Sequence, residues 1–352
     1  MQKKVSHKPK IVVIEYGIDV VRSQYKEGKT SRRLFYGALQ LEERYNVVYD
    51  SFNAYSRWKF FINNFKLLQS ADMIYMPYLY ASTLVFFSFL RKLGLYRRRK
   101  LVAVCHKTMD KGSNFISHWL YEVLYSTIDV VLFHSPKNME ESVKASLVKD
   151  EHAQVLQWGD DLQYIDKNFP KSKGSFFLSS GSEQRDFRIL IDAFSNTGAQ
   201  LELYTNKVHY DNNYDFLSIE QGKYPHIKIE FVERNANTAQ FLGQRTSECL
   251  CVVIPLLKER VNYCVGLTSV VEAMAMGKPI ISSRNSFFPI DLEKEKIGFY
   301  VDDVVSWEKA IRFIADHPDE AATMGKRARL LAEQKFNIDA TAFQLESIMH
   351  KR

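Results

Sequence analysis

The sequence has few cysteines, and their spacing is not typical of a metal site. Cys105, Cys249, Cys251 and Cys264 are the four cysteines of the chain, and each lies in or beside an apolar run. Isolated cysteines in such runs are typical of reduced core thiols in a cytosolic protein. The sequence therefore predicts no bound metal.

Long apolar runs are also absent. Residues 1–10 are polar and basic, and the first apolar run, at 11–14, is too short for a signal peptide. The longest run, at 82–90, is too short to span a bilayer. We therefore expect a cytoplasmic protein, with peripheral contact to the inner face of the membrane as an open alternative.

Acidic residues are missing from one basic segment. The net charge of the chain is +7, and six cations with no acid lie between Arg91 and Lys100. They follow an aromatic and aliphatic run, so the segment from Leu84 to Lys100 could lie on an anionic membrane at about 1 kcal/mol per cation. The alternative is a buried helix followed by a solvated basic turn. We expect no nucleic acid partner, because no nucleic-acid-binding motif accompanies the charge.

The length of 352 residues, of which 46% are hydrophobic, favours two globular domains. Short apolar runs alternate with amphipathic segments throughout, which predicts an α/β fold with parallel sheets covered on both faces. In the first half we expect strands at 10–14, 47–49, 73–76, 101–105, 130–133 and 155–158, and a helix at 34–45 among others. The polar segment around Pro170 separates an N-terminal domain, 1–160, from a second series, 174–335, by a linker at 161–173.

Residues 266–281, GLTSVVEAMAMGKPII, have the pattern of a short helix followed by a buried strand. We predict the helix at 270–276 with Glu272 in its first turn or so, ended by Gly277 and Pro279. Gly266, Thr268 and Ser269 come just before it. Free N–H groups at a helix N-terminus favour an anion, so this stretch predicts a phosphate site. The alternative is an ordinary strand–helix crossover with a solvated glutamate.

A second candidate anion site follows an earlier strand. The loop 179–186, SSGSEQRD, opens a helix, so the N–H groups around Gly181 and Ser182 could hold a phosphate while Arg185 supplies a positive charge. Together the two stretches predict a site for a nucleotide diphosphate, with one stretch at the phosphates and the other at the ribose. The arginine neutralises the phosphates, and Glu272 accepts the two ribose hydroxyls.

Two histidines, His106 and His134, fall at the ends of predicted strands in the first domain. A histidine there can act as a general base or donate to a substrate, and the alternative is a structural role on loop backbone. The sequence GKTS at Gly28 suggests a P-loop, which we reject. Ser23 stands where that motif needs its first glycine, and the loop lies far from the strand end.

Residues 266–281 resemble the signature of retaining glycosyltransferases with two Rossmann-like domains, the GT-B fold, particularly family 4. Three further segments are similar in order and spacing: 157–162 to an interdomain WGVDL segment, 181–187 to a donor-phosphate loop, and 321–336 to a closing helix. The similarity covers roughly 158–350. It implies two domains facing a cleft, with a C-terminal helix, 336–352, that packs back toward the first domain.

The resemblance implies transfer of a sugar from a UDP- or GDP-linked donor to an acceptor hydroxyl, lipid-linked or on a polysaccharide, in surface glycan biosynthesis. Glu272 would hold the ribose, and Arg185 would stabilise the leaving diphosphate. Gly181, Ser182, Gly266, Thr268 and Ser269 would contact the donor. His106, from its position at a strand end, is a further candidate catalytic residue. A retaining reaction without a metal or a further cofactor is implied, in which the leaving phosphate takes the acceptor proton.

Two positions depart from the family pattern. Cys264 stands eight positions before Glu272, where family 4 enzymes commonly have a second glutamate, and Glu259 is out of register. Ser182 rather than arginine follows Gly181. Two alternatives therefore stay open: a non-catalytic binding or scaffold protein, and a nucleotide-sugar epimerase of the same fold.

Overall fold

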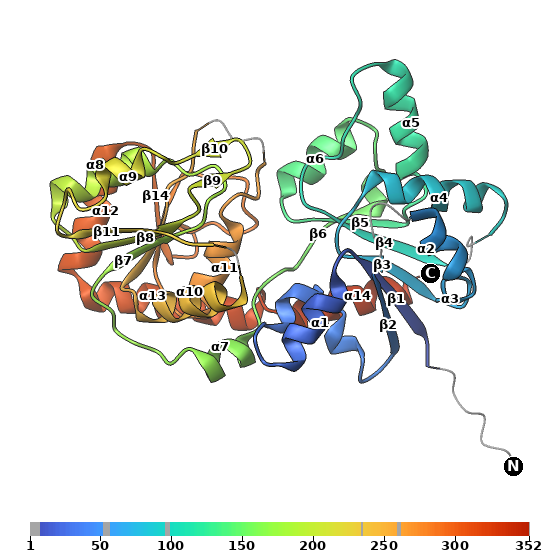
Figure 1. The fold of residues 1–352 in the computed structure, drawn as a ribbon, viewed down its shortest axis with the longest axis horizontal. Coiled ribbons are helices and arrows are strands. Elements are labelled where there is room, and N and C mark those ends of the chain that lie inside the picture. The colour runs from blue at the N-terminus through green and yellow to red at the C-terminus, as the bar shows by residue number, and fades with distance from the viewer. Residues whose placement is uncertain (1–7, 52–56, 96–98, 234, 259–261, 352) are drawn as a thin grey trace, which may run out of the picture. The chain divides into compact units, whose positions relative to one another are not determined.

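The chain forms two compact units (Figure 1). A computed structural model describes residues 8–51, 57–95, 99–233, 235–258 and 262–351. Unit 1 comprises Met1–Gly28, Arg32–Trp158 and Ile338–Arg352, and unit 2 comprises Lys29–Ser31 and Gly159–Asn337. The predicted linker falls inside unit 2, where Asp161 caps helix α7 (Leu162–Asn168) by accepting from the Tyr164 N–H.

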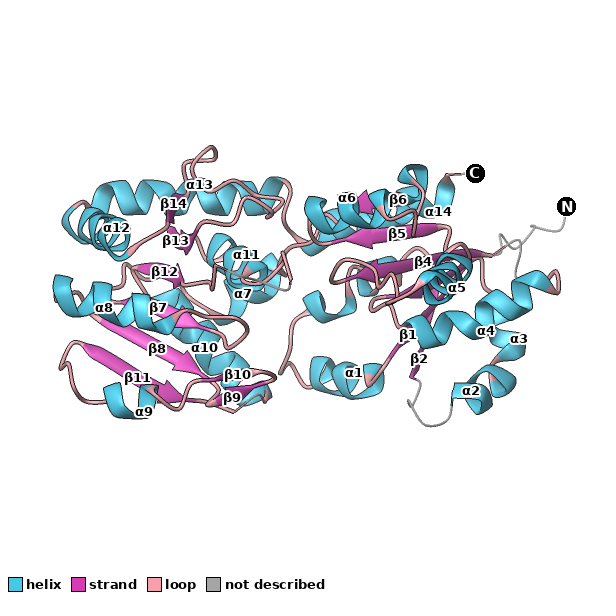
Figure 2. Ribbon diagram, turned by 90° about the horizontal axis from the view of Figure 1, so that it is seen from above, coloured by secondary structure: helices cyan, strands magenta, loops and turns pink. Residues whose placement is uncertain are grey.

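Unit 1 is built on a six-stranded parallel sheet of order β2-β1-β3-β4-β5-β6. The strands read as continuous apolar runs because helices cover both faces (Figure 2). Strand order reverses between β1 and β3, so ligands are expected at the carboxyl ends of these strands. The strands are β1 (Lys10–Glu15), β2 (Asn46–Ser51), β3 (Met73–Met76), β4 (Lys100–Cys105), β5 (Val130–Phe133) and β6 (Ala153–Val155).

The described helices of unit 1 include one from the far end of the chain. α14 joins unit 1, where Glu346 pairs with Arg44 at 2.6 Å and Thr341 donates to the Gln157 carbonyl. The α-helices are α1 (Ile18–Lys26), α2 (Arg57–Asn63), α3 (Phe65–Gln69), α4 (Ala81–Lys92), α5 (Phe115–Tyr125), α6 (Pro136–Lys144) and α14 (Ile338–His350).

The helix predicted at 34–45 is wrong. Two short 3₁₀ helices, Arg32–Phe35 and Leu39–Leu41, occupy this segment instead. Between them Tyr36 and Gly37 have φ angles of 48° and 83°, which a right-handed helix cannot include. A Cβ on Gly37 would lie 2.8 Å from the Ala342 nitrogen, so the break lets this segment pack closely on α14.

Helix α4 contains the apolar part of the segment that was predicted to lie on a membrane. Leu84, Phe86, Phe87 and Leu90 are buried in the core of unit 1. Arg91 is bonded to Asp129, and Arg97 and Arg98 lie outside the described residues. On the other face of α4, however, Val85 is 45% exposed and Phe89 is 55% exposed, so membrane contact by this segment stays a prediction.

Unit 2 is built on a second six-stranded parallel sheet, of order β11-β8-β7-β12-β13-β14. Its strand order reverses between β7 and β12, the point where a Rossmann-type sheet binds its ligand. The strands are β7 (Phe177–Ser180), β8 (Leu201–Thr205), β11 (Ile227–Phe231), β12 (Cys251–Ile254), β13 (Ile280–Ser283) and β14 (Gly298–Val301). A small hairpin, β9 (Val208–His209) and β10 (Asn212–Asn213), lies beside the sheet.

The helices of unit 2 lie on both faces of this sheet (Figure 2). With α7 they are α8 (Phe187–Thr197), α9 (Leu217–Glu220), α10 (Ala236–Glu248), α11 (Leu267–Ala275), α12 (Val304–Asp316) and α13 (Pro318–Gln334). Trp307 of α12 is fully buried in the core between helices and sheet. Across the described residues of both units, no helix has the length and apolar character needed to cross a membrane.

Candidate functional site

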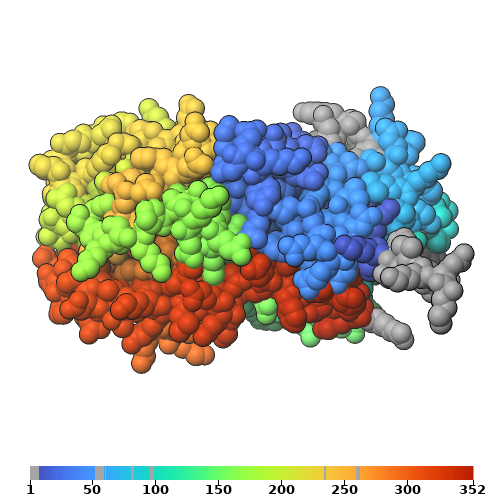
Figure 3. All heavy atoms as spheres, turned by 90° about the horizontal axis from the view of Figure 1, so that it is seen from below, coloured from blue at the N-terminus to red at the C-terminus, as the bar shows by residue number. Residues whose placement is uncertain are grey.

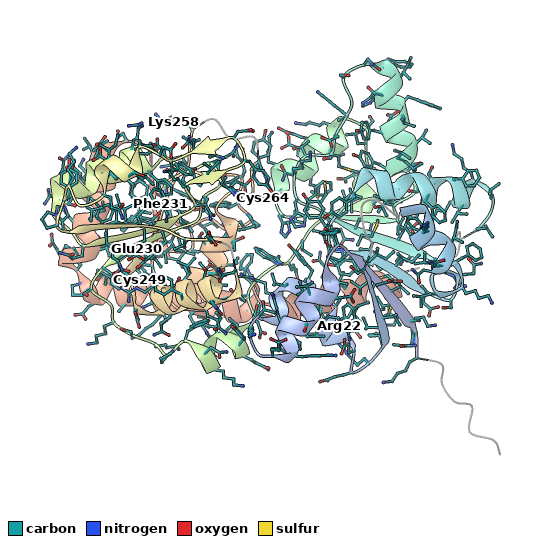
Figure 4. The ribbon with its side chains drawn as sticks, viewed as in Figure 1. Arg22, Glu230, Phe231, Cys249, Lys258 and Cys264 are labelled. Atoms are coloured by element: carbon teal, nitrogen blue, oxygen red, sulfur yellow. The ribbon has the colours of Figure 1, made fainter. Side chains whose placement is uncertain are left out.

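The two stretches predicted to bind a nucleotide diphosphate meet at the switch point of the unit 2 sheet. β7 and β12 are parallel neighbours, so their carboxyl ends lie at the same edge. The loop after β7 is bonded to the segment after β12: Leu257 donates to the Gln184 carbonyl at 3.0 Å, and Asp186 donates to the Pro255 carbonyl at 3.2 Å. That segment leads to α11 through Cys264, while Cys249 precedes β12 at its other end (Figure 4).

Arg185 is a buried cation in this loop. Only 6% of the residue is exposed, its Nη1 donates to the Glu183 carbonyl at 2.9 Å, and its Nε has no partner among the described residues. Burial lowers the pKa of Arg185 to about 10, so the guanidinium stays charged at neutral pH. No described carboxylate lies within ion-pair distance of it. A buried charge without a counter-ion favours binding of an anion.

Gly181 allows the guanidinium of Arg185 to pack against the loop backbone. Its φ of 119° lies in the region that favours glycine, and a Cβ there would lie 2.8 Å from Nη2 of Arg185. The guanidinium therefore lies against the backbone of the loop at the end of β7.

The hydroxyl of Ser182 is already engaged. It donates to Asn206 Oδ1 at 2.9 Å and accepts from the Asn206 N–H at 2.8 Å and from Thr205 Oγ1 at 3.1 Å. These bonds attach the loop to the end of β8. The predicted contact of Ser182 with a donor stays a prediction, and in the structure its side chain holds the loop in shape.

Helix α11 begins earlier than predicted. Gly266 caps it with a φ of 91°, so Thr268 and Ser269 lie in its first turn rather than before it. A Cβ on Gly266 would lie 3.1 Å from Ile254 and 3.3 Å from Leu256, which fixes the start of the helix against the end of β12. The backbone N–H groups of Thr268 and Ser269 have no acceptor among the described residues, as expected for a first turn.

Glu272 consequently lies in the second turn of α11, not in the first. It is the sixth residue of the helix and is half-buried. The helix contains no acid in its first turn, so the positive end of its dipole is not neutralised from within. Glu259, which is out of register for the second glutamate of the family pattern, lies outside the described residues.

A different kind of site lies at the carboxyl edge of the unit 1 sheet. His106 follows β4, stacks on Tyr78 with ring centroids 4.6 Å apart, and has its Nε2 3.0 Å from the Pro77 carbonyl. A carbonyl only accepts, so Nε2 carries the proton and Nδ1 is left as an acceptor. Burial lowers the pKa of His106, which keeps this imidazole neutral at pH 7.

His134 follows β5 and is buried beside His106. The two ring centroids are 4.6 Å apart, and Trp158 lies 5.0 Å from His134 on another side. Both ring nitrogens of His134 and Nε1 of Trp158 are buried without a partner among the described residues. Burial, followed by electrostatic coupling to His106, holds the pKa of His134 well below its ordinary value. The cluster therefore has hydrogen-bonding capacity that the described residues do not use.

Sequence reasoning missed Glu15 and Tyr36, which belong to the same edge. Glu15 ends β1 at the switch point, and burial raises its pKa to about 7. Burial and then the charge of Glu15 raise the pKa of Tyr36, which stacks on Trp158 at 6.2 Å. Glu15 could have been found from the sequence, because it is a carboxylate at the end of the first buried strand, KIVVIE. Tyr36 could not, because its position depends on the break in the predicted helix.

The residues that could bind a metal do not gather in the described part of the chain. No group of three His, Cys, Asp or Glu side chains lies close enough to hold an ion there. Positive charge at the unit 2 edge comes instead from Arg185 and the start of α11.

Comparisons with known proteins agree on the fold. No family model matches the sequence, and no curated protein matches it significantly. Among solved structures, Alr3699/HepE of Anabaena with UDP and glucose superposes with a TM-score of 0.64 at 14% identity, covering 98% of this chain and 100% of that one. A glycosyltransferase of Rickettsia africae gives a TM-score of 0.68 at 13% identity, covering 97% and 98%.

The chain has the GT-B fold. The two six-stranded sheets are the two Rossmann-like halves of that fold, as the sequence predicted. A putative UDP-N-acetylglucosamine 2-epimerase of Listeria monocytogenes also shares it, with a TM-score of 0.57 at 10% identity and coverage of 97% and 96%. Membership in family 4 stays a prediction, because identities this low establish the GT-B fold alone.

Proposed function

We propose that this protein transfers a sugar from a nucleotide-diphosphate sugar to an acceptor hydroxyl. The observation that carries the proposal is that Arg185 and the start of α11 both lie against the end of β12: Arg185 forms a bridge with Leu256, and a Cβ on Gly266 would lie 3.3 Å from Leu256. A buried cation and unpaired N–H groups at one sheet edge form a site for a diphosphate. HepE was crystallised with UDP and with UDP-glucose, which favours uridine over guanosine in the donor.

In the proposed reaction the bond between the anomeric carbon and the diphosphate oxygen breaks, and a bond from that carbon to the acceptor oxygen forms. Arg185 and the N–H groups of Thr268 and Ser269 stabilise the charge on the leaving diphosphate, so no metal is required. Glu272 accepts the ribose hydroxyls. The acceptor proton passes to the leaving phosphate, and the configuration of the sugar is retained.

We assign acceptor binding to the carboxyl edge of the unit 1 sheet. His106 offers Nδ1 as an acceptor, and burial raises the pKa of Glu15 to about 7. Either group can accept a hydrogen bond from an acceptor hydroxyl and orient it.

We propose a lipid-linked or polysaccharide acceptor of a surface glycan pathway and peripheral contact with the membrane. Besides the segment 84–100, a second surface of unit 1 is suited to this contact. Along one face of α5, which stands at the periphery of unit 1 (Figure 1), large apolar side chains remain exposed: Phe115 by 83%, Ile116 by 76%, Trp119 by 55% and Leu120 by 49%. Such a stripe can lie in a lipid interface.

Co-sedimentation with anionic vesicles tests the membrane contact. Replacing Ile116 and Leu120 by serine should reduce the bound fraction several-fold, while replacing the exposed Val305 of α12 by serine should not change it. Equal sedimentation of both variants would refute α5 as the membrane surface.

Binding and turnover of a panel of nucleotide sugars test the central proposal. We expect saturable binding of at least one UDP-sugar, slow release of free sugar without acceptor, and transfer when an acceptor glycan is added. Absence of binding to every donor would reject the proposal. Binding without transfer or hydrolysis would support the non-catalytic alternative.

The epimerase alternative rests on the fold of the Listeria protein. It requires acid and base groups around the donor sugar. The carboxylates of the two stretches at the unit 2 edge are Glu183, Asp186 and Glu272, and Asp186 caps α8 by accepting from the Ile189 N–H. Conversion of a UDP-sugar into its 2-epimer without an acceptor would favour this alternative over transfer.

A further inference from the structure

A cavity of about 800 Å³ lies at the other edge of the unit 2 sheet. It is formed where β12 and β13 begin, whereas the candidate donor site is formed where β7 and β12 end. Its walls come from residues 171–174, from the turn between α11 and β13, and from one face of α13. Figure 3 shows this face of unit 2, with the green segment that precedes β7 beside the orange-red α13.

The inner surface of the cavity is largely apolar. Side chains that line it include Leu250, Met276, Pro279, Pro318, Ala321 and Leu330. The wall is held by a close approach of two glycines: a Cβ on Gly325 of α13 would lie 2.1 Å from the Gly277 carbonyl oxygen. Apolar pockets of this size are typical sites for small molecules.

A buried lysine faces this cavity. Lys278 is 4% exposed, and its Nζ donates to the Cys249 carbonyl at 2.7 Å and to the Ser172 carbonyl at 2.8 Å. An ammonium group has three donors, so one has no acceptor among the described residues. Burial lowers the pKa of Lys278, which shows that its charge is poorly solvated there.

Further cations stand at the rim. Lys171, Lys173 and Lys326 are exposed, line the cavity, and have no carboxylate within ion-pair distance among the described residues. The cavity has two acids, Asp319 and Glu333. Glu333 is bonded to Arg329, which also pairs with Asp166.

We propose that this cavity binds an amphiphilic anion: an apolar chain that ends in a phosphate or a carboxylate. The chain would lie along the apolar wall, and the head group would meet Lys278 and the three rim lysines. An uncharged chain would leave the excess positive charge unbalanced, and a small hydrophilic anion would leave the apolar wall in water.

The site is separate from the donor site, so the two can be tested independently. α11 has its first turn at the donor edge, and Met276, which follows its last residue, lines the cavity. None of the residues assigned to the donor site lines the cavity. Loss of UDP binding therefore would not test this proposal, and loss of amphiphile binding would not test the proposed transferase activity.

The experiment is calorimetric titration of the full chain with dodecyl phosphate below its micellar concentration. We expect one site per chain. A triple variant, Lys171→Glu, Lys173→Glu and Lys326→Glu, should weaken binding at least tenfold, and Ala322→Trp should abolish it by filling the cavity from α13. The control is Lys309→Glu, an exposed lysine of α12 outside the cavity, which should bind as the wild type does.

UDP affinity and thermal unfolding of each variant show that it is folded. No saturable binding of dodecyl phosphate to the wild type would overturn the proposal, as would equal affinity in folded variants or equally tight binding of the uncharged dodecyl maltoside. Competition by phosphatidylglycerol vesicles would identify a membrane lipid as the source of the ligand. Failure of the vesicles to compete would identify a free amphiphile.

Discussion

In unit 2 the sheet's switch point is lined by backbone N–H groups and one buried arginine, whereas in unit 1 it is lined by carboxyl, imidazole and aromatic side chains. The guanidinium at the first site stays mostly charged between pH 6 and 9, because burial lowers the pKa of Arg185 only to about 10. At the second site Glu15 titrates near pH 7. Donor binding and acceptor chemistry should therefore respond to pH and to mutation in different ways.

The largest expected effect is that of Arg185→Ala. Removing a buried charge that stabilises a leaving diphosphate should lower kcat by about 10³-fold. Arg188→Ala is the matched control, because that exposed arginine of α8 lies over the Phe216 ring at 4.0 Å and does not reach the loop. Steady-state kinetics of both variants measure the difference, and similar turnover in the two would reject the assignment of Arg185.

Glu272→Gln should weaken donor binding rather than slow the sugar-transfer step. An amide can accept from one ribose hydroxyl but carries no charge, so UDP affinity should fall by about tenfold, or roughly 1.4 kcal/mol. Glu320→Gln, in the first turn of α13, serves as the control. Calorimetric titration with UDP measures both, and unchanged affinity in the Glu272 variant would exclude ribose binding there.

Comparing Gly266→Ala with Gly198→Ala separates the cost of backbone strain from an effect on the position of α11. Gly266 and Gly198 both have positive φ, but a Cβ on Gly266 would contact Ile254 whereas nothing lies within 4 Å of one on Gly198. Both variants should lose about 1 kcal/mol of folding stability. Only Gly266→Ala should also weaken UDP binding, because it shifts the first turn of α11. Denaturant unfolding and titration give the two quantities, and equal UDP affinity in the two variants would contradict this reasoning.

Glu15→Gln should have the smallest effect and should act on unit 1 alone. The folded state keeps the Glu15 proton up to about pH 7, while the unfolded chain releases it near the ordinary value of 4.5. Wild-type stability from this group is therefore greatest at low pH and falls as pH rises toward 7.

Glu15→Gln removes this loss of stability at high pH. The variant should therefore be more stable than the wild type at pH 8, relative to the same comparison at pH 5, on the order of 1 kcal/mol once solvent screening is allowed for. UDP affinity should not change, and the pH dependence of transfer near pH 7 should flatten. Thermal unfolding at both pH values and a kcat/KM profile measure this, and an unaltered profile would remove Glu15 from the reaction.

The same contrast explains what the sequence could predict. The unit 2 site is made from two local stretches in which glycines, small residues and a helix start stand at fixed spacing, so 179–186 and 266–272 were recognisable. The unit 1 site is assembled from strand ends far apart in the chain, at Glu15, His106 and His134. Only the strand-end position of the two histidines could be anticipated.

The errors have physical causes in tertiary contacts. The pattern at 34–45 is helical, but packing of Gly37 against α14 and the left-handed backbone at Tyr36 break the helix. α11 starts three residues early because Gly266 adopts a left-handed cap against β12.

Hydrogen exchange of the full chain with and without saturating UDP tests the central claim most directly. If the donor binds at the switch point of unit 2, peptides covering 179–187 and 262–272 should be protected, while peptides covering 171–174 and 318–333 should exchange as before. Protection confined to unit 1, or no protection in either of the first two segments while UDP is bound, would contradict the account.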